Sequence, residues 1–385
     1  MTKSGPQMRN PKRQSLVPQP QRTRPEDQGQ RTKSETFGDI PNRNLLERLG
    51  QAALHLGTRS FLVGGPVRDL ILERKSPDLD IAVEEGSREF GAVVAKELGG
   101  RFVYHARFFS GSVILPPTPD PQSPTPVHID ITQTRAETYE RPAVLPAVRP
   151  ASIVGDLGRR DFTINAMALE ITPGSFGEFI DPFDGRTDVE QRRVRVLHAR
   201  SFIDDPTRVF RCIRFATRLG FEIERQTLDL MRSAIGQRLP AFLTPERVLY
   251  ELRLICAEPL VVSMVRALIR ERLLEAAWRW TPPSRFLAGM RKLAKSLPGR
   301  YPRGQSTTGQ SPDFAGRADL LFIYWLSVLP VTDRFPIRKE ERDAAEAIAE
   351  FGTLRTKLKP RLKPSAVYQV LRGVPEPALA VLAAL

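Results

Sequence analysis

Two aspartates and a pair of glycines, about a dozen residues apart, are the first residues in this chain whose types and spacing suit chemistry. The segment DLDIAV (78–83) has the composition of a β-strand. On a strand, residues i and i+2 point to the same face and lie about 7 Å apart. Carboxylates that close repel each other unless a cation lies between them, and Mg²⁺ is the usual cation where phosphates are bound. Asp78 and Asp80 are therefore candidate metal ligands and candidate catalytic residues.

The glycine pair suits a phosphate. Gly64 and Gly65 follow the apolar run FLV (61–63) and precede apolar residues at helical spacing. Glycine lets a backbone N–H approach a ligand closely, and a helix start attracts negative charge. Arg68 follows in the same helix. Residues 61–84 are expected to form strand, glycine turn, short helix, turn and strand. Each pattern is common by itself, and the two together are more specific.

Arginine and aspartate gather again in LGRRDFTINAMALE (157–170). Arg159, Arg160 and Asp161 stand just before an apolar stretch, as at the start of a helix. Paired arginines can hold a triphosphate through bidentate hydrogen bonds. Asp161 can cap the expected helix or bind a ribose hydroxyl. A surface salt-bridge cluster is the alternative reading of this segment.

A second such segment begins at Asp205, which with Pro206 suits the first positions of a helix. Arg208, Arg211 and Arg214 then recur every three residues. A basic stripe of this kind is more often a solvated helix face. The functional alternative is base reading, because a carboxylate accepts from the exocyclic amine of C or A while a guanidinium donates to the neighbouring ring atom.

Asp130 lies on a further expected strand, VHIDIT (127–132). Beside Asp78 and Asp80 it would suit a general base or an additional metal contact. A carboxylate that faces solvent or a basic neighbour is an equally good interpretation.

These motifs, taken in order, resemble the class II tRNA nucleotidyltransferase and bacterial poly(A) polymerase family. The resemblance rests on LVGGPVRD (62–69) with DLD (78–80), RRDFTINAMA (159–168), DPFDGRTD (181–188) and DDPTRVFRCIRF (204–215), and it covers about residues 57–256. Asp204 departs from the family, which usually has Glu there. LTPERVLYEL (243–252) is similar to the family's bracing motif, so Glu246 and Arg247 are expected to be structural.

The resemblance implies an α+β fold: a polymerase-β-like nucleotidyltransferase head with a small mixed sheet, followed by an all-helical neck, body and tail. The expected segments are a disordered basic tail (1–40), the head (41–200), a neck with nucleobase- and RNA-binding helices (201–282) and a tRNA-binding body and tail (283–385). Along these segments we expect helices at 44–56, 89–98, 226–239, 244–256, 264–280, 318–330 and 338–351, a loop at 135–150, and insertions at 116–126 and 299–316.

The implied activity is template-independent addition of C and/or A to the 3′ end of tRNA from CTP and ATP. Asp78 and Asp80 would hold Mg²⁺, with Asp130 as a third catalytic candidate. The expected nucleotide-binding residues are Gly64, Gly65, Arg68, Arg160, Asp161, Asp205, Arg208, Arg211 and Arg214, with Asp205 and Arg208 selecting the base. A poly(A) polymerase, a CC-only or A-only enzyme, and a catalytically silent tRNA-binding protein are the alternatives.

Composition agrees with a polyanionic partner. The 385 residues include 58 Lys+Arg and 44 Asp+Glu, a net charge of +14. Residues 1–40 contribute +4 of this, so most of the excess lies in the body, where the basic segment RTKLKPRLK (355–363) is expected to meet an RNA backbone or solvent.

The chain has two cysteines, Cys212 and Cys256, and we expect both to be buried free thiols in a reducing setting. Without a long apolar run or a signal core, we expect a cytoplasmic protein that does not span a membrane. Its oligomeric state stays open.

Overall fold

The computed structural model describes residues 40–74, 79–116, 128–297, 317–329, 336–351, 369 and 371–385. Several predictions fall outside this part of the chain: the basic tail before Ile40, Asp78, both insertions apart from Pro116, and the basic segment 355–363.

A seven-stranded mixed sheet forms the centre of the first half of the chain, in the order β3-β4-β5-β2-β1-β8-β9. Neighbours β2 and β5 run parallel, and the other pairs run antiparallel. The strands are β1 (Ser60–Val63), β2 (Leu79–Val83), β3 (Arg101–His105), β4 (Ser110–Ile114), β5 (His128–Gln133), β8 (Ala168–Glu170) and β9 (Phe179–Ile180).

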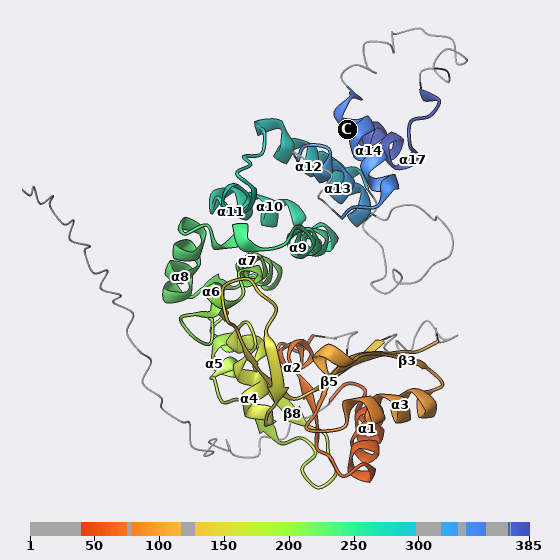
Figure 1. Ribbon diagram of the computed structural model, residues 1–385, viewed down its shortest axis with the longest axis vertical. Helices are drawn as coiled ribbons and strands as arrows, with labels where there is room; N and C mark the ends of the chain where they lie inside the picture. The colour runs from red at the N-terminus through yellow and green to blue at the C-terminus, as the bar shows by residue number, and fades with distance from the viewer. Residues whose placement is uncertain are drawn as a thin grey trace, which may run out of the picture. The chain divides into compact units, whose positions relative to one another are not determined.

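One face of the sheet is covered by helices, and the other carries the aspartates. Helices α1 (Arg43–His55) and α3 (Ser87–Leu98) cover one face (Figure 1), where Ile81 and Ile129 are almost fully buried. Burying such a side chain contributes about 1.5–3 kcal/mol. Because strand residues alternate between faces, this burial turns Asp80 and Asp130 toward the opposite face. The predicted strand, glycine turn and helix are confirmed, since α2 (Gly65–Ile71) follows directly from β1.

The expected loop at 135–150 is instead a two-stranded ribbon. Strands β6 (Arg135–Thr138) and β7 (Ala147–Pro150) pair antiparallel, from Arg135 opposite Pro150 to Thr138 opposite Ala147. The ribbon lacks a fully buried face, so its sequence shows no hydrophobic alternation. The sequence of these strands therefore lacks the two-residue hydrophobic period by which a strand is predicted.

The prediction of a helix after Asp161 was also wrong. Helix α4 (Ile153–Gly158) ends before Arg159, and a short 3₁₀ turn, η2 (Thr163–Asn165), leads into strand β8. The apolar run is buried between β1 and β9 in the sheet. A short continuous apolar run fits a buried strand as well as a helix, which explains the error.

Helices dominate the rest of the described chain, interrupted by the small parallel pair β10 (Arg193–Val194) and β11 (Glu222–Ile223). A mixed sheet followed by helices confirms the predicted α+β class. Its segment boundaries stay a prediction. The shorter elements are η1 (Ala106–Phe108), α5 (Gly185–Glu190), α6 (Ser201–Asp204) and η3 (Leu239–Phe242). The remaining helices are α7 (Thr207–Leu219), α8 (Arg225–Gly236), α9 (Pro245–Ala257), α10 (Val261–Arg270), α11 (Leu273–Trp278), α12 (Ser284–Ser296), α13 (Arg317–Leu326), α14 (Lys339–Ala349) and α17 (Glu376–Ala384).

The single helix expected at 264–280 is divided into α10 and α11. Arg272 has a φ of 56°, in the left-handed region, and ends the helical path. The turn brings Leu273 and Leu274 into the core, where both are at most 1% exposed. Burial of this leucine pair offsets the cost of the turn.

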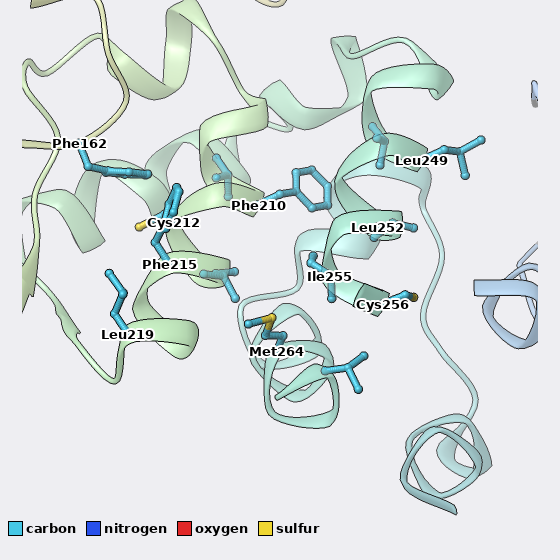
Figure 2. Packing of buried hydrophobic residues seen from close by; sticks show 14 of the residues in the cluster. Phe162, Phe210, Cys212, Phe215, Leu219, Leu249, Leu252, Ile255, Cys256 and Met264 are labelled. Atoms are coloured by element: carbon cyan, nitrogen blue, oxygen red, sulfur yellow. The ribbon is translucent and has the colours of Figure 1, made fainter. Parts of the chain in front are cut away.

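An apolar core joins α7 to α9 and α10 (Figure 2). Phe162, just after the RRD motif, packs edge-on against Phe215 of α7, with ring centroids 5.9 Å apart. Cys212 and Cys256 are buried free thiols, as predicted, and burial raises the pKa of both. This core fixes α7 beside the RRD segment. Among the described residues, no helix is long and apolar enough to cross a membrane.

Candidate active site

A cleft of about 850 Å³ opens on the face of the sheet opposite α1 and α3. It collects ten of the twelve predicted site residues from four separate stretches of sequence. Eight arginines and six carboxylates line it. The predicted residues in its lining are Gly64, Gly65, Arg68, Asp80, Asp130, Arg160, Asp161, Asp205, Arg208 and Arg211. Of the other two, Asp78 lies outside the described residues and Arg214 lies elsewhere.

Carboxylates gather at the centre of the sheet. Asp80 of β2 is in register with Asp130 of β5, so both side chains rise from the same face of adjacent strands. Asp130 is exposed and accepts a 2.5 Å hydrogen bond from the Ser112 hydroxyl on β4. The strand register thus places Asp130 beside Asp80, and the catalytic role of Asp130 stays a prediction. Carboxylate oxygens are the ligands that Mg²⁺ prefers, so the chemistry of this pair fits that ion, although the described residues contain no cluster of three or more metal-ligating side chains.

The glycine turn brings the phosphate-binding candidates close to this pair. Gly64 has a φ of +74°, and its N–H donates to the Met167 carbonyl at 3.1 Å. A Cβ at this position would lie 2.6 Å from Nη1 of Arg160 and 3.8 Å from Oδ2 of Asp80. Glycine is therefore required both for the backbone conformation and for the close approach of Arg160.

One buried carboxylate orients both arginines of the RRD motif. Asp156 is fully buried, and it accepts hydrogen bonds from Arg159 at 2.8 Å and from Arg160 at 3.1 Å. Burial opposes its ionisation, but the two guanidinium groups outweigh burial and lower the pKa of Asp156. Arg159 also pairs with Glu137 at 2.9 Å. Asp156 does not line the cleft itself and acts through these arginines.

Asp161 joins the head segment to α7. Its carboxylate is 2.6 Å from Nη2 of Arg211 and accepts from the Asn165 amide at 3.0 Å. Burial alone would raise the pKa of Asp161, but Arg211 and Asn165 lower it to about 2. The Asn165 side chain also accepts from Arg68, at 2.7 Å. These contacts form a continuous network of hydrogen bonds and ion pairs from α2 to α7.

The two predicted base-reading residues are held differently. Arg208 is 5% exposed; its Nη1 donates to Ser201 and its Nη2 to the Arg159 carbonyl, each at 2.7 Å. Asp205 accepts at Oδ1 from the Thr207 N–H at 3.0 Å, as a helix-capping residue does, although α7 begins two residues after it. Arg208 is therefore fixed mainly by the chain itself, while Asp205 faces the cleft.

Arg214, predicted to bind nucleotide, lies in a buried ion-pair cluster outside the cleft lining. It is 3.4 Å from Glu251 and 3.8 Å from Glu258, both of them buried. Burial raises the pKa of Glu251 despite the Arg214 charge. Spacing of three residues rotates each arginine about 60° from the last, so Arg214 faces α9 rather than the cleft. Its predicted nucleotide contact finds no geometric support.

Sequence reasoning missed two residues that shape the cleft. Arg247 was expected to be structural, yet it lines the cleft and contacts Asp205 at 2.7 Å. No local signal links the two, since they are 42 residues apart. Asp156 carried a weak signal, because residues three and four apart on a helix are neighbours and Arg159 and Arg160 follow it at that spacing.

Comparison with known proteins agrees with this arrangement. A family model described as the poly A polymerase head domain matches residues 60–195. The chain is 40% identical over 222 residues to an A-adding tRNA nucleotidyltransferase of Halalkalibacterium halodurans, covering 57% of this chain and 50% of that protein. It is 35% identical over 202 residues to a CC-adding tRNA nucleotidyltransferase of Deinococcus radiodurans, covering 52% and 51%.

A solved structure of a CCA-adding enzyme in an apo form has a TM-score of 0.71 and 29% identity, covering 90% of this chain and 80% of that one. The chain spans about half the length of the two curated relatives. The stretch that is similar to the poly A polymerase head domain contains the glycine turn, the sheet carboxylates and the RRD motif. Asp205, Arg208, Arg211 and Arg247 lie beyond its matched range, so the cleft is completed by the helices that follow the head domain.

Proposed function

We propose that this protein is a nucleotidyltransferase that adds C or A to the 3′ end of tRNA, using CTP or ATP. The observation that carries the proposal is the composition of the cleft. A glycine turn, sheet carboxylates and the carboxylate of Asp205 from a separate element all line it. The names of the relatives supply the reaction class and the RNA substrate.

The sheet carboxylates would hold Mg²⁺. Asp80, with Asp78 and Asp130, would be its ligands, and the ion would lower the pKa of the RNA 3′-hydroxyl and neutralise charge on the α-phosphate. The phosphates would lie against the Gly64–Gly65 turn, where Arg68 and Arg160 supply positive charge. Arg68 and Arg160 are already oriented by Asn165 and Asp156, so little ordering cost remains for them when a nucleotide binds.

Base selection would depend on Asp205. In the described part of the chain, the three donors to its carboxylate all reach Oδ1: the N–H and hydroxyl of Thr207, and Arg247. Oδ2 is left to accept a hydrogen bond from an exocyclic amine. C and A both present such an amine, whereas U presents a carbonyl at the corresponding place. Arg208, buried beneath, would support the base from its fixed position.

The two relatives point to different products. Identity is higher to the A-adding protein than to the CC-adding one, so A addition is the first activity to test. A poly(A) polymerase and a catalytically silent tRNA-binding protein are the remaining candidates.

Product length separates these possibilities. The protein is incubated with tRNA transcripts that end before the first C, after CC or after CCA, each with CTP, ATP or both. An A-adding enzyme extends the CC-ended transcript by one nucleotide with ATP; a CC-adding enzyme extends the shortest by two with CTP. A CCA-adding enzyme does both, and a poly(A) polymerase produces long tails. Asp80→Ala serves as the inactive control. If no transcript is extended under any of these conditions, the proposal is wrong.

A further inference from the structure

Phe215 of α7 has three arginines around its ring. The guanidinium carbons of Arg68, Arg211 and Arg214 lie 5.6, 5.4 and 5.1 Å from the ring centroid. Separations below about 6 Å allow cation–π attraction, in which the negative face of an aromatic ring attracts a cation. Arg68 comes from α2, whereas the other two arginines lie on α7 itself. The ring therefore joins cations from two separate elements.

Apolar packing alone does not account for these charges. Arg68 and Arg214 are only 3% and 6% exposed, and burying a charge is costly unless it is compensated. Carboxylates compensate part of it: Arg68 lies 2.8 Å from Asp69, and Arg211 lies 2.6 Å from Asp161. The aromatic ring adds a further attraction. Because the ring is itself 7% exposed, water screens this attraction little, and it is stronger than at a solvated surface.

An aromatic ring holds a guanidinium without occupying its N–H groups. Arg68 donates from Nη1 to Asn165 at 2.7 Å, and from Nε and Nη2 to Asp69. Its Nη2 also lies 3.6 Å from the place that a Cβ on Gly65 would take, so the cation is next to the glycine turn. A second carboxylate in place of the ring would compete for these donors and would repel phosphates. The ring leaves both the donors and the positive charge available to an anion.

Phe215 is placed to connect two parts of the cleft. Phe215, Arg68 and Arg211 all belong to its lining. On another side, Phe162 packs edge-on against the ring, with the centroids 5.9 Å apart (Figure 2). The apolar core therefore fixes the ring, and the ring fixes the distance between the arginine of α2 and that of α7.

We propose that Phe215 is a positioning residue for triphosphate binding: its ring holds Arg68 and Arg211 at the cleft by cation–π attraction and leaves their donors to the phosphates. This inference rests on the proposed function, because it requires a nucleoside triphosphate at the glycine turn. It gives α7 a second role, since the helix expected to read the base also fixes a phosphate-binding arginine of α2.

The test changes the charge distribution of the ring and leaves its shape almost unchanged. Phenylalanine analogues with one, two or three ring fluorines replace Phe215, because each fluorine withdraws electrons from the ring face and weakens its attraction for a cation. Titration calorimetry measures the dissociation constants of ATP and of tripolyphosphate, each with Mg²⁺. Tripolyphosphate lacks a base and reports phosphate binding alone. We expect both constants to rise stepwise, by about tenfold with three fluorines, while the KM for tRNA and the urea midpoint stay unchanged.

Phe210 supplies the matched control. It lies on the same helix and is fully buried in the apolar core (Figure 2). The same fluorine series at Phe210 should leave both dissociation constants unchanged. An equal rise there would assign the effect to the core and would contradict the inference. Phe215→Leu is a second variant, which removes the ring and keeps an apolar side chain. It should weaken tripolyphosphate binding at least as much as three fluorines do.

The outcomes separate this inference from the proposed function. If the wild-type protein extends tRNA and the fluorine series at Phe215 leaves both dissociation constants unchanged, the inference is wrong and the proposed function stands. The same conclusion follows if folded Phe215→Leu binds tripolyphosphate as tightly as the wild type, because packing alone would then be sufficient. If the wild-type protein binds neither ATP nor tripolyphosphate and extends no tRNA, both fall together.

Discussion

Asp80 and Asp130 are direct register partners across the parallel strands β2 and β5. Paired residues on neighbouring strands lie about 5 Å apart and share a face, so two carboxylates meet at the centre of the cleft. The Ser112 hydroxyl satisfies one oxygen of Asp130. The two aspartates therefore differ in environment although they lie side by side.

Replacing each aspartate should separate their roles. We expect Asp80→Asn to lower kcat by on the order of a thousandfold. The variant lacks the negative charge that would hold the metal ion, and this loss costs several kcal/mol of transition-state stabilisation. Asp130→Asn should lower activity by roughly tenfold and raise the Mg²⁺ concentration needed for half-maximal rate. Initial rates at varied Mg²⁺ measure both. Asp229→Asn, at an exposed position on α8, is the control. Equal effects of the Asp80 and Asp130 variants would contradict this division.

Replacing Gly64 should lower activity by more than backbone strain alone explains. Gly64→Ala must adopt a φ of +74° and would also place Cβ 2.6 Å from Nη1 of Arg160. Gly99 has a similar φ, +67°, with nothing within 4 Å of its Cβ. Both substitutions should cost about 1–3 kcal/mol of unfolding free energy. Gly64→Ala should in addition lower kcat/KM about a hundredfold by displacing Arg160. Denaturant melts and initial rates give the two quantities. Comparable activity in the two variants would rule out the steric argument.

Asp156 should affect nucleotide binding without touching the nucleotide. Asp156→Asn removes the charge that orients Arg159 and Arg160. Breaking a buried pair costs about 3–5 kcal/mol, and the arginines would lose their fixed positions. We expect the KM for nucleotide to rise several-fold more than the KM for tRNA. Asp188→Asn is the matched control, since Asp188 is equally buried and pairs with Arg195 outside the cleft. A similar rise of nucleotide KM in that control would assign the effect to general destabilisation.

The Asp161–Arg211 pair predicts a dependence of stability on acid pH. The pKa of Asp161 is lowered from 3.8 to about 2. A lowered pKa stabilises the folded protein above the unfolded-state value, and that contribution is lost as pH falls from about 4 toward 2. Wild-type protein should thus lose roughly 2 kcal/mol more than Asp161→Asn over this range. Urea unfolding at several pH values measures the difference, and parallel pH profiles would contradict it.

Much of the first half of the fold could be predicted from sequence because its signals are local. The strand, glycine turn and helix at 61–84 depend on a short apolar run, helical spacing and one backbone conformation, all visible within a few residues. The expected strand at 127–132 carried Asp130, and the pairing of β5 with β2 decided that it lies beside Asp80. The resemblance of the motifs extended this to the helices after residue 200, although α7 begins one residue later than the expected cap at Asp205 would place it.

The wrong secondary-structure predictions concern segments whose hydrophobic pattern is ambiguous or absent. A fully buried strand at 168–170 looks like a helix, and the ribbon at 135–150 has no buried face to leave a period. A left-handed Arg272 divides an apolar pattern that reads as one helix.

The sequence by itself determined the chemical inventory: carboxylates at strand spacing, a glycine turn, paired arginines and an acidic residue at a helix start. The tertiary structure decided which of these share a cleft. It placed Arg214 against buried glutamates, set Asp156 behind the RRD arginines, and brought Arg247 to Asp205 and Ala143. Such contacts join segments up to 104 residues apart, and packing of α7 and α9 on a common core sets their distances. Residue spacing along the chain carries no record of the contacts between distant segments, whereas Asp156 left the weak signal of its three- and four-residue spacing from the RRD arginines.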